Sequence, residues 1–257
     1  KLGWYGLRVL CGAVLLFLLA PIFVIIPLSF SNSSFLSYPI PGWSLRWYHE
    51  LFASDDWARA TRNSFIVAPL ATLIATTLGT LAAVGLARVQ FFGKGLLTSL
   101  LIAPMVVPIV VVGVSAYLFF ARIGLSDSYT GIVLVHAALG APFVVTTVMA
   151  TLQNFNQNLV KASLSLGAGP LKTFFRVTLP VIAPGVISGA LFAFATSFDE
   201  VVVVLFLAGP AQTTLPRQMF TGIRENISPT IAAVATLLIL FTALLMMTLE
   251  WLRGRTK

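Results

Sequence analysis

Long apolar runs recur along the chain, and they limit its possible folds more than any other feature. Several runs reach eighteen residues or more, and about 20 apolar residues are enough for a helix to cross a hydrocarbon core of about 30 Å. The alternating pattern of outer-membrane barrel strands is absent from the sequence. Because lipid offers the backbone no hydrogen-bond partners, the runs predict an all-α membrane protein.

We expect six membrane-spanning helices that form a single transmembrane domain over residues 1–257. The first apolar run is longer than a signal-peptide core of about 7–15 residues, and no small-x-small cleavage site follows it, so we interpret it as a retained span. The expected spans cover approximately residues 9–30, 63–87, 96–121, 130–152, 178–207 and 229–252.

The charges predict how the helices are oriented. Charged residues are only 9% of the chain, whereas soluble domains carry about 25%. If the N-terminus is cytoplasmic, ten of the 16 lysines and arginines, including Lys1, Arg255 and Lys257, fall on the cytoplasmic side. The positive-inside rule then places both termini and the segment 153–177 in the cytoplasm. The net charge of +8 is thereby explained without a nucleic-acid partner, and none is expected.

The segment 153–177 has an internal pattern of its own. Gly167 permits a left-handed turn, and Pro170 suits the first turn of a new helix, so the run 167–170 predicts a break between two short helices. Both helices are amphipathic and basic. Such an element can lie on lipid headgroups or fit a groove on a partner protein, and the pattern alone leaves both alternatives open.

Residues 159–180 closely resemble the EAA loop of ATP-binding-cassette importer permeases, with Gly167 and the pair Leu179 and Pro180 at the family spacing. The resemblance implies a coupling helix that docks in a cleft of an ATP-hydrolysing subunit. Val160 and Lys161 stand where the family has acidic residues, which removes the usual ionic contact from the expectation but not the docking. The residues that the resemblance assigns to coupling are Lys161, Ala162, Ser163, Gly167, Ala168, Gly169, Pro170, Phe174, Leu179 and Pro180.

Further stretches resemble the spermidine/putrescine-type permeases of this family, so that the resemblance covers nearly the whole chain. It implies a type I importer permease fold in the bacterial inner membrane and a small polar solute, such as a polyamine or a similar cation, as the substrate. The stretches are Asn63 and Ser64, Ala103 and Pro104, 197–200, and 214–216.

The resemblance also implies the partners. These are two ATP-binding-cassette subunits that carry ATP and Mg, a second permease subunit, expected to be a related but different chain, and a periplasmic solute-binding protein. The chain itself is expected to be neither an enzyme nor a binder of cofactor or metal, because the sequence shows no metal-ligand cluster, phosphate-cradling loop or nucleophile triad. It is not expected to bind ATP, because it lacks the G-x-x-x-x-G-K-[ST] motif. The alternative is a self-contained secondary transporter, which usually shows inverted repeats, and no convincing repeat is present.

Asp199 and Glu200 form the only acidic pair within an expected span. A charge at bilayer depth is costly, so the pair predicts a functional site, and Phe192 and Thr196 precede it on the same helix face. We expect these four residues to line the substrate path or to form an outer gate. In the alternative, the acids form a salt bridge or a helix cap, with Arg217 or Arg224 as partners.

Three other features carry structural expectations. Pro104 and Pro108 are the strongest candidates for a functional bend. The pair Gly185 and Gly189 permits close helix packing, for which an interface between two permease subunits is one possible place. His136 has no carboxylate within a few turns, and we expect a packed or hydrogen-bonded histidine.

Overall fold

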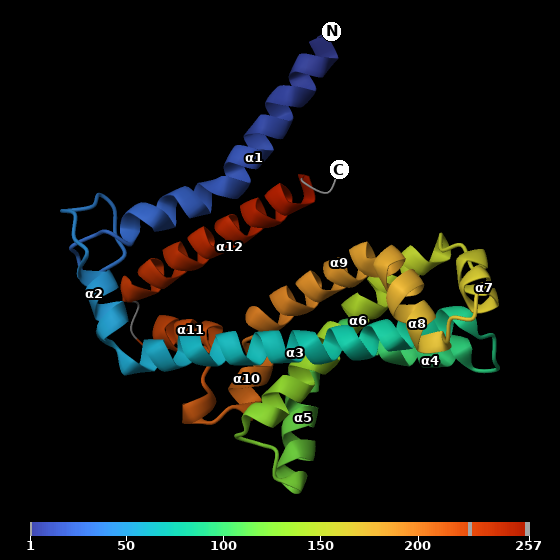
Figure 1. The fold of residues 1–257 in the computed structure, drawn as a ribbon. Helices are drawn as coiled ribbons and strands as arrows, with labels where there is room; N and C mark the ends of the chain where they lie inside the picture. The colour runs from blue at the N-terminus through green and yellow to red at the C-terminus, as the bar shows by residue number, and fades with distance from the viewer. Residues whose placement is uncertain (1, 226–227, 255–257) are drawn as a thin grey trace. The chain divides into compact units, whose positions relative to one another are not determined.

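The computed structural model describes residues 2–225 and 228–254, and all the named elements of this part are helices (Figure 1). Lys1, Arg255 and Lys257, which the orientation argument uses, lie outside it. The chain forms two compact units, one made of Lys1–Ala58 with Gln218–Lys257 and the other of Arg59–Arg217. The expectation of a single domain stays a prediction, and each unit is described by itself.

The first unit contains α1 (Leu2–Leu28), α2 (Arg46–Ala53) and α12 (Thr230–Gly254), with α12 packed against the other two. The connection from α1 to α2 is held by side chains. Trp47 is buried and donates its indole N–H to the carbonyl of Ser31 over 2.7 Å, and the hydroxyls of Ser29 and Tyr48 are 2.8 Å apart. In contrast, α1 exposes its apolar side chains on nearly every side, as a helix in contact with lipid would.

The second unit is built around α3 (Asp55–Arg88), α6 (Tyr129–Gln153) and α9 (Leu179–Phe198), of which α3 begins in the first unit. The α9 helix runs alongside α6 (Figure 1). Within the described residues, four helices are long and apolar enough to cross a membrane. They are Trp4–Leu28, Asp55–Arg88, Tyr129–Gln153 and Pro170–Phe198.

The expected third span is sharply bent. The α4 helix (Lys94–Ile102) continues through a 3₁₀ turn, η1 (Ala103–Met105), and meets α5 (Ile109–Ile123) at 99°. Pro104 lies in the turn, and Pro108 is the residue before α5. The bend predicted at these two prolines is therefore confirmed. Its physical cause is that each proline lacks the backbone N–H that a continuous helix would need.

The fifth span, expected as one element over 178–207, is divided in the structure. The helix ends at Phe198, and a separate short helix, α10 (Val202–Leu207), follows it. A carboxylate oxygen of Glu200 accepts the backbone N–H of Val203 over 2.8 Å, which stabilises the new helix start. Val203, Val204 and Leu207 are buried, and α10 packs against α5. This packing offsets the loss of helix hydrogen bonds at the break.

Small residues set the contact between α6 and α9. A Cβ atom added at Gly189 would lie 2.7 Å from the Cα of Val144, and one at Gly140 would lie 3.0 Å from the Cβ of Ala193. Gly185 is buried against Thr147 and Thr151 in the same way. The glycine pair of α9 is therefore used within the chain, which corrects the suggested place at an interface between two permease subunits.

We predict that Gly189→Ala destabilises the second unit, while Gly85→Ala does not. The added methyl at Gly189 meets backbone, and such overpacking costs about 1–3 kcal/mol, whereas a Cβ at Gly85 has no atom within 4 Å. The melting temperature of each variant is measured in detergent, with gel filtration used to monitor how much folded protein remains after heating. Equal melting temperatures for the two would contradict the close approach of α6 and α9.

Candidate functional site

The segment after α6 forms two short helices joined by a tight turn. The first is α7 (Asn158–Ser165), and the second is α8 (Pro170–Thr173), which continues into a π-helical turn, η2 (Phe174–Thr178). Gly167 has a φ of +82°. The N–H of Gly167 donates to Leu164 over 3.0 Å, and that of Ala168 donates to Ser163 over 3.1 Å. This is a Schellman motif, which favours glycine because other residues are strained at that φ.

The two helices are tied to each other and to the bundle. The hydroxyls of Ser163 on α7 and Thr173 on α8 are 3.0 Å apart, and Thr173 is buried. The guanidinium of Arg88, the last residue of α3, donates to the hydroxyl of Thr178 over 3.4 Å. Phe174 packs against the main hydrophobic cluster. The element therefore has a fixed base on the membrane helices.

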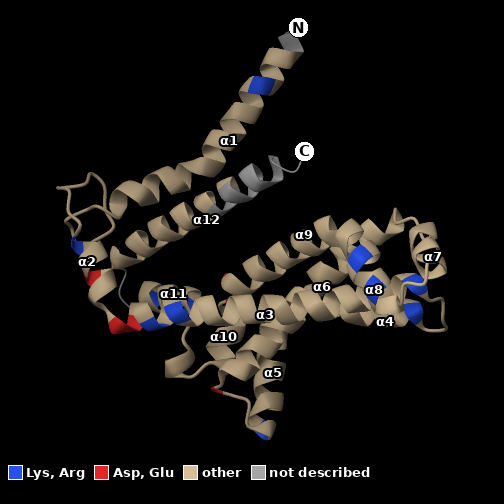
Figure 2. Ribbon diagram, viewed as in Figure 1, with Lys and Arg blue, Asp and Glu red and all other residues tan. Residues whose placement is uncertain are grey.

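The turn between α7 and α8, together with the start of α8, presents apolar side chains to the outside. Leu166 is 88% exposed, and Leu171 is 75% exposed. Lysines and arginines lie around this end of the unit, among them the exposed Lys161 and Lys172 (Figure 2). An apolar tip with a basic surround can dock in an apolar groove that has an acidic rim.

The predicted coupling residues fall into two groups. Most of those in α7, the turn and the start of α8 are exposed, although Ser163 and Ala168 are half-buried. Phe174 and Leu179 pack against the hydrophobic cluster and belong to the base, where Pro180 follows as an exposed residue of α9. Val160 also packs against this cluster, so its side chain is partly withdrawn from the surface that a partner would meet. The members of the exposed group are Lys161, Ala162, Gly167, Gly169 and Pro170.

The acidic pair lies at the break between α9 and α10 rather than inside a helix. Asp199 is exposed, and its N–H closes the last turn of α9 by donating to the carbonyl of Ala195 over 3.0 Å. Glu200 is partly buried, and its carboxylate caps α10 through the N–H of Val203. The two carboxylates therefore have different roles in the structure, and that of Asp199 is the more accessible.

Phe192 and Thr196 approach the break along α9. Phe192 is 55% exposed, and its ring stacks on that of Phe143 from α6, with the centroids 6.0 Å apart. Thr196 follows one turn later and is partly buried. With Asp199, they form a helix face that offers an aromatic ring, a hydroxyl and a carboxylate, groups that can bind an organic cation.

Arg217, one of the two arginines considered as ion-pair partners of the acids, donates to the carbonyl of Ala208. Partial burial lowers the pKa of the Arg217 guanidinium, and the negative charge of Asp127 opposes that shift. Arg217 thus stabilises the end of α10. Of the alternatives left open by the sequence, helix capping describes the contact that Glu200 makes.

His136 makes the hydrogen bond expected for a packed histidine. It is buried, and its Nδ1 lies 2.8 Å from the hydroxyl of Ser197. This contact joins α6 to α9 just before the acidic break. Within the described residues, no group of three His, Cys, Asp or Glu side chains could hold a metal ion.

Sequence reasoning assigned no structural role to Asn63 and Ser64, although the resemblance included them. Both are buried, and they bind the chain beyond α10, about 150 residues further on in sequence. The amide of Asn63 donates to the carbonyls of Ala211 and Thr213 over 2.9 and 2.8 Å. No local pattern signals a contact at this separation.

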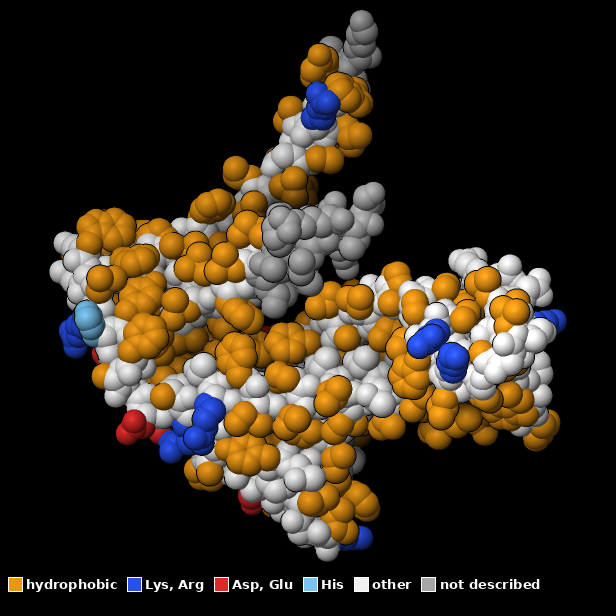
Figure 3. Space-filling model, in the orientation of Figure 1, with side chains coloured by type: hydrophobic (Ala, Val, Ile, Leu, Met, Phe, Trp, Pro, Cys, Tyr) orange, Lys and Arg blue, Asp and Glu red, His pale blue; other side chains and the backbone are white. Residues whose placement is uncertain are grey.

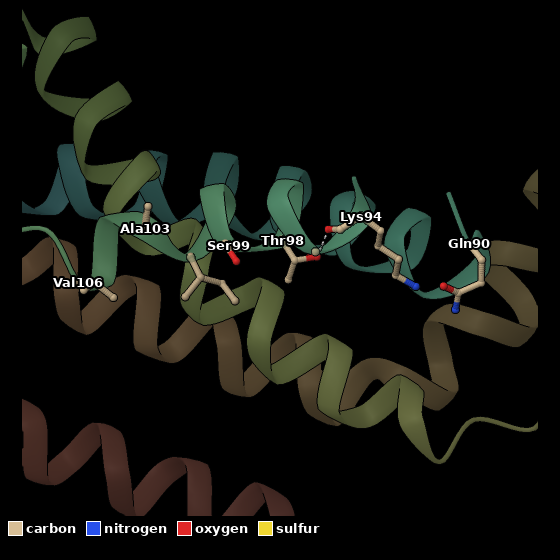
Figure 4. A pocket seen from close by; sticks show the side chains of 8 residues that line it. Gln90, Lys94, Thr98, Ser99, Ala103 and Val106 are labelled. Carbon is tan, nitrogen blue, oxygen red and sulfur yellow. Dashed lines mark hydrogen bonds between the residues drawn. The ribbon is translucent and has the colours of Figure 1, made fainter. Parts of the chain in front are cut away.

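A cleft of about 610 Å³ along α4 was also not predicted (Figure 4). Its polar end carries Lys94, Thr98 and Ser99, and its apolar end reaches Val106. The ammonium of Lys94 would repel a cation, so we do not assign a cation path to this cleft. The α4 helix has no buried residue.

The chain is similar to known transport proteins. The family model "Binding-protein-dependent transport system inner membrane component" matches residues 75–257. The putrescine transport system permease protein PotI of Escherichia coli K12 is 37% identical over 87% of this chain and 82% of its own. The spermidine/putrescine transport system permease protein PotC of the same strain is 30% identical over 95% of this chain and 93% of its own.

Two solved structures share the fold. The first is a bacterial ABC transporter involved in the import of the acidic polysaccharide alginate, with a TM-score of 0.79, 14% identity and coverage of 97% of this chain and 95% of that one. The second is the bacterial alginate ABC transporter in complex with an alginate pentasaccharide-bound periplasmic protein. Its TM-score is 0.70, its identity is 19%, and the match covers 94% of this chain and 91% of that one. With helices of membrane-spanning length, the chain belongs to the family of binding-protein-dependent transport system inner membrane components, as a permease subunit of an importer.

Proposed function

We propose that this permease subunit imports a small organic cation of the polyamine class across the bacterial inner membrane, driven by ATP hydrolysis on a separate subunit. The observation that carries the ATP-driven part is the element formed by α7, the Gly167 turn and α8. It combines an exposed apolar tip with a base packed on the bundle, which is the arrangement that a lever needs.

The coupling works through the fixed base. When the ATPase subunit moves the tip, the force reaches η2 and then α9, because these segments follow one another without a flexible linker. The contact between Arg88 and Thr178 passes part of it to α3. The ten coupling residues predicted from the sequence, from Lys161 to Pro180, are proposed in this role, with Leu166 and Leu171 as further contacts of the tip.

The substrate class rests on two supports. The relatives PotI and PotC are named for putrescine and for spermidine/putrescine transport. The face of Phe192, Thr196 and Asp199 offers groups that suit an ammonium, namely an aromatic ring, a hydroxyl and an exposed carboxylate. The 20 residues of α9 extend over about 30 Å, so Asp199 would lie near the outer boundary of the bilayer.

The complete importer is proposed to contain two ATP-binding-cassette subunits with ATP and Mg, a second, related permease subunit and a periplasmic solute-binding protein. This chain is proposed to bind neither the nucleotide nor a metal. The six spans, the single domain and the cytoplasmic termini belong to the same proposal. Family membership favours this arrangement over a self-contained secondary transporter.

We predict that Gly167→Ala uncouples transport, while Gly169→Ala has little effect. Neither glycine has an atom within 4 Å of an added Cβ, but only Gly167 has a positive φ, so only Gly167→Ala strains the turn, by about 1–2 kcal/mol. Putrescine uptake and ATP hydrolysis by the assembled complex measure the effect. Native coupling in Gly167→Ala would contradict the lever role of the turn.

We predict that Asp199→Asn lowers putrescine uptake more than Glu200→Gln does. The exposed Asp199 carboxylate is free to attract a cation, whereas glutamine at position 200 keeps an oxygen that can accept the N–H of Val203. Uptake by cells with equal amounts of each variant in the membrane is the measurement. If both variants take up putrescine at the native rate, the acidic pair does not recognise the cation directly.

A further inference from the structure

A buried polar cluster fastens the chain after α10 to the beginnings of α3 and α6. The side chain of Asn63 is fully buried, and each of its polar atoms is used. Its amide nitrogen donates to the carbonyls of Ala211 and Thr213, over 2.9 and 2.8 Å. Its amide oxygen accepts the hydroxyl of Tyr129, the first residue of α6, over 2.8 Å.

Two further contacts extend the cluster. The hydroxyl of Ser64 accepts the backbone N–H of Leu215, the first residue of α11, over 2.8 Å. The hydroxyl of Tyr129 also lies 3.2 Å from the carbonyl of Ala211. We call Asn63, Ser64 and Tyr129 the latch. It binds three positions of the segment 209–215, each through the backbone, so the identity of the bound side chains matters little.

The latched segment holds the far end of the chain that follows the acidic break. The chain from Asp199 to Leu215 is anchored near its start, where Glu200 caps α10, and at its end, where the latch holds it. Between these anchors, Val203, Val204 and Leu207 are buried in the bundle. If the latch opened, α10 would keep its apolar packing but would lose the fixed end that sets its position.

We propose that Asn63 is a positioning residue for transport: by fastening the segment 209–215 to α3 and α6, it holds α10 and the adjoining acidic break in place. The inference rests on the proposed function only where it refers to transport, because the latch itself is a matter of the fold. Opening it would leave buried donors and acceptors without partners, a state that native proteins avoid. We therefore expect the latch to stay closed and to move with α3 and α6 as one body.

Thiol labelling tests the latch directly. In a Cys11→Ser background, Thr214→Cys places a thiol at a position that is 3% exposed, and Ala211→Cys places one at an exposed position. A polar maleimide is added to membranes opened by freezing and thawing, so that the result does not depend on orientation. We expect slow labelling at 214, fast labelling at 211, and labelling at 214 that becomes about tenfold faster with Asn63→Leu, the factor that corresponds to about 1.4 kcal/mol.

Two matched variants calibrate this result. Tyr129→Phe removes the hydroxyl but leaves both amide donations of Asn63, so labelling at 214 should rise less than with Asn63→Leu. Ser64→Ala removes one bond and serves as the test if Asn63→Leu does not accumulate in membranes. If the thiol at position 214 is labelled as slowly in Asn63→Leu as in the native background, the latch does not exist. The same result in Ser64→Ala has that meaning if Asn63→Leu does not accumulate.

Hydrolysis of ATP separates positioning from a merely structural role. In the assembled complex, Asn63→Leu should keep basal hydrolysis but lose most of the stimulation by the loaded solute-binding protein, whereas a general loss of structure lowers both. Native stimulation together with an exposed thiol at position 214 would overturn the positioning role. Failure of the Asp199→Asn prediction would leave the labelling result intact, so the two proposals fail separately.

Discussion

The close approach of α6 and α9 is the contact on which the rest of the second unit depends. Lipid chains are as apolar as the side chains they touch, so helices in a membrane gain little from the hydrophobic effect and must pack backbone against backbone. Gly140, Gly185 and Gly189 permit this approach. Because α9 is fixed on α6, the segments at its two ends acquire defined positions, with η2 and the coupling element at one and Asp199 at the other. Many large apolar side chains are exposed among the described residues, and Figure 3 shows them across the face that it draws.

The α9 helix therefore joins the two parts of the proposed mechanism. In that mechanism, a displacement of the Gly167 turn would reach α9 through η2, and the opposite end of α9 carries the acidic break. His136 binds Ser197 just before that break, so α6 restrains α9 close to the acids as well as along its length. In the proposed mechanism, α6 therefore restrains α9 at several points between the coupling element and the acidic break.

Local signals predicted those parts of the fold that local chemistry decides. The bend at Pro104 and Pro108 follows from two missing donors, and the turn at Gly167 follows from a positive φ that glycine tolerates. The end of α9 at Phe198 was not predicted, because apolar residues resume directly after Asp199 and Glu200 and neither Gly nor Pro marks the break. Packing of α10 against α5 decides that break, and the sequence pattern does not contain this information.

The same limit applies to the sites. The exposed tip of the coupling element was predictable because its residues are neighbours in sequence. The partner of the glycine pair was not, since a small-residue spacing shows that a helix can approach another but not which one. The latch joins residues about 150 positions apart, and only the folded chain brings Asn63 to Thr213.

In the mechanism that we propose, this chain moves its solute only when a separate subunit hydrolyses ATP. The direct measurement is uptake of labelled putrescine into liposomes that contain the chain, with its second permease and ATPase subunits added or omitted, the solute-binding protein outside and ATP inside. We expect uptake only with all subunits, the binding protein and ATP present. Uptake by this chain alone, driven by an ion gradient and indifferent to ATP, would contradict it.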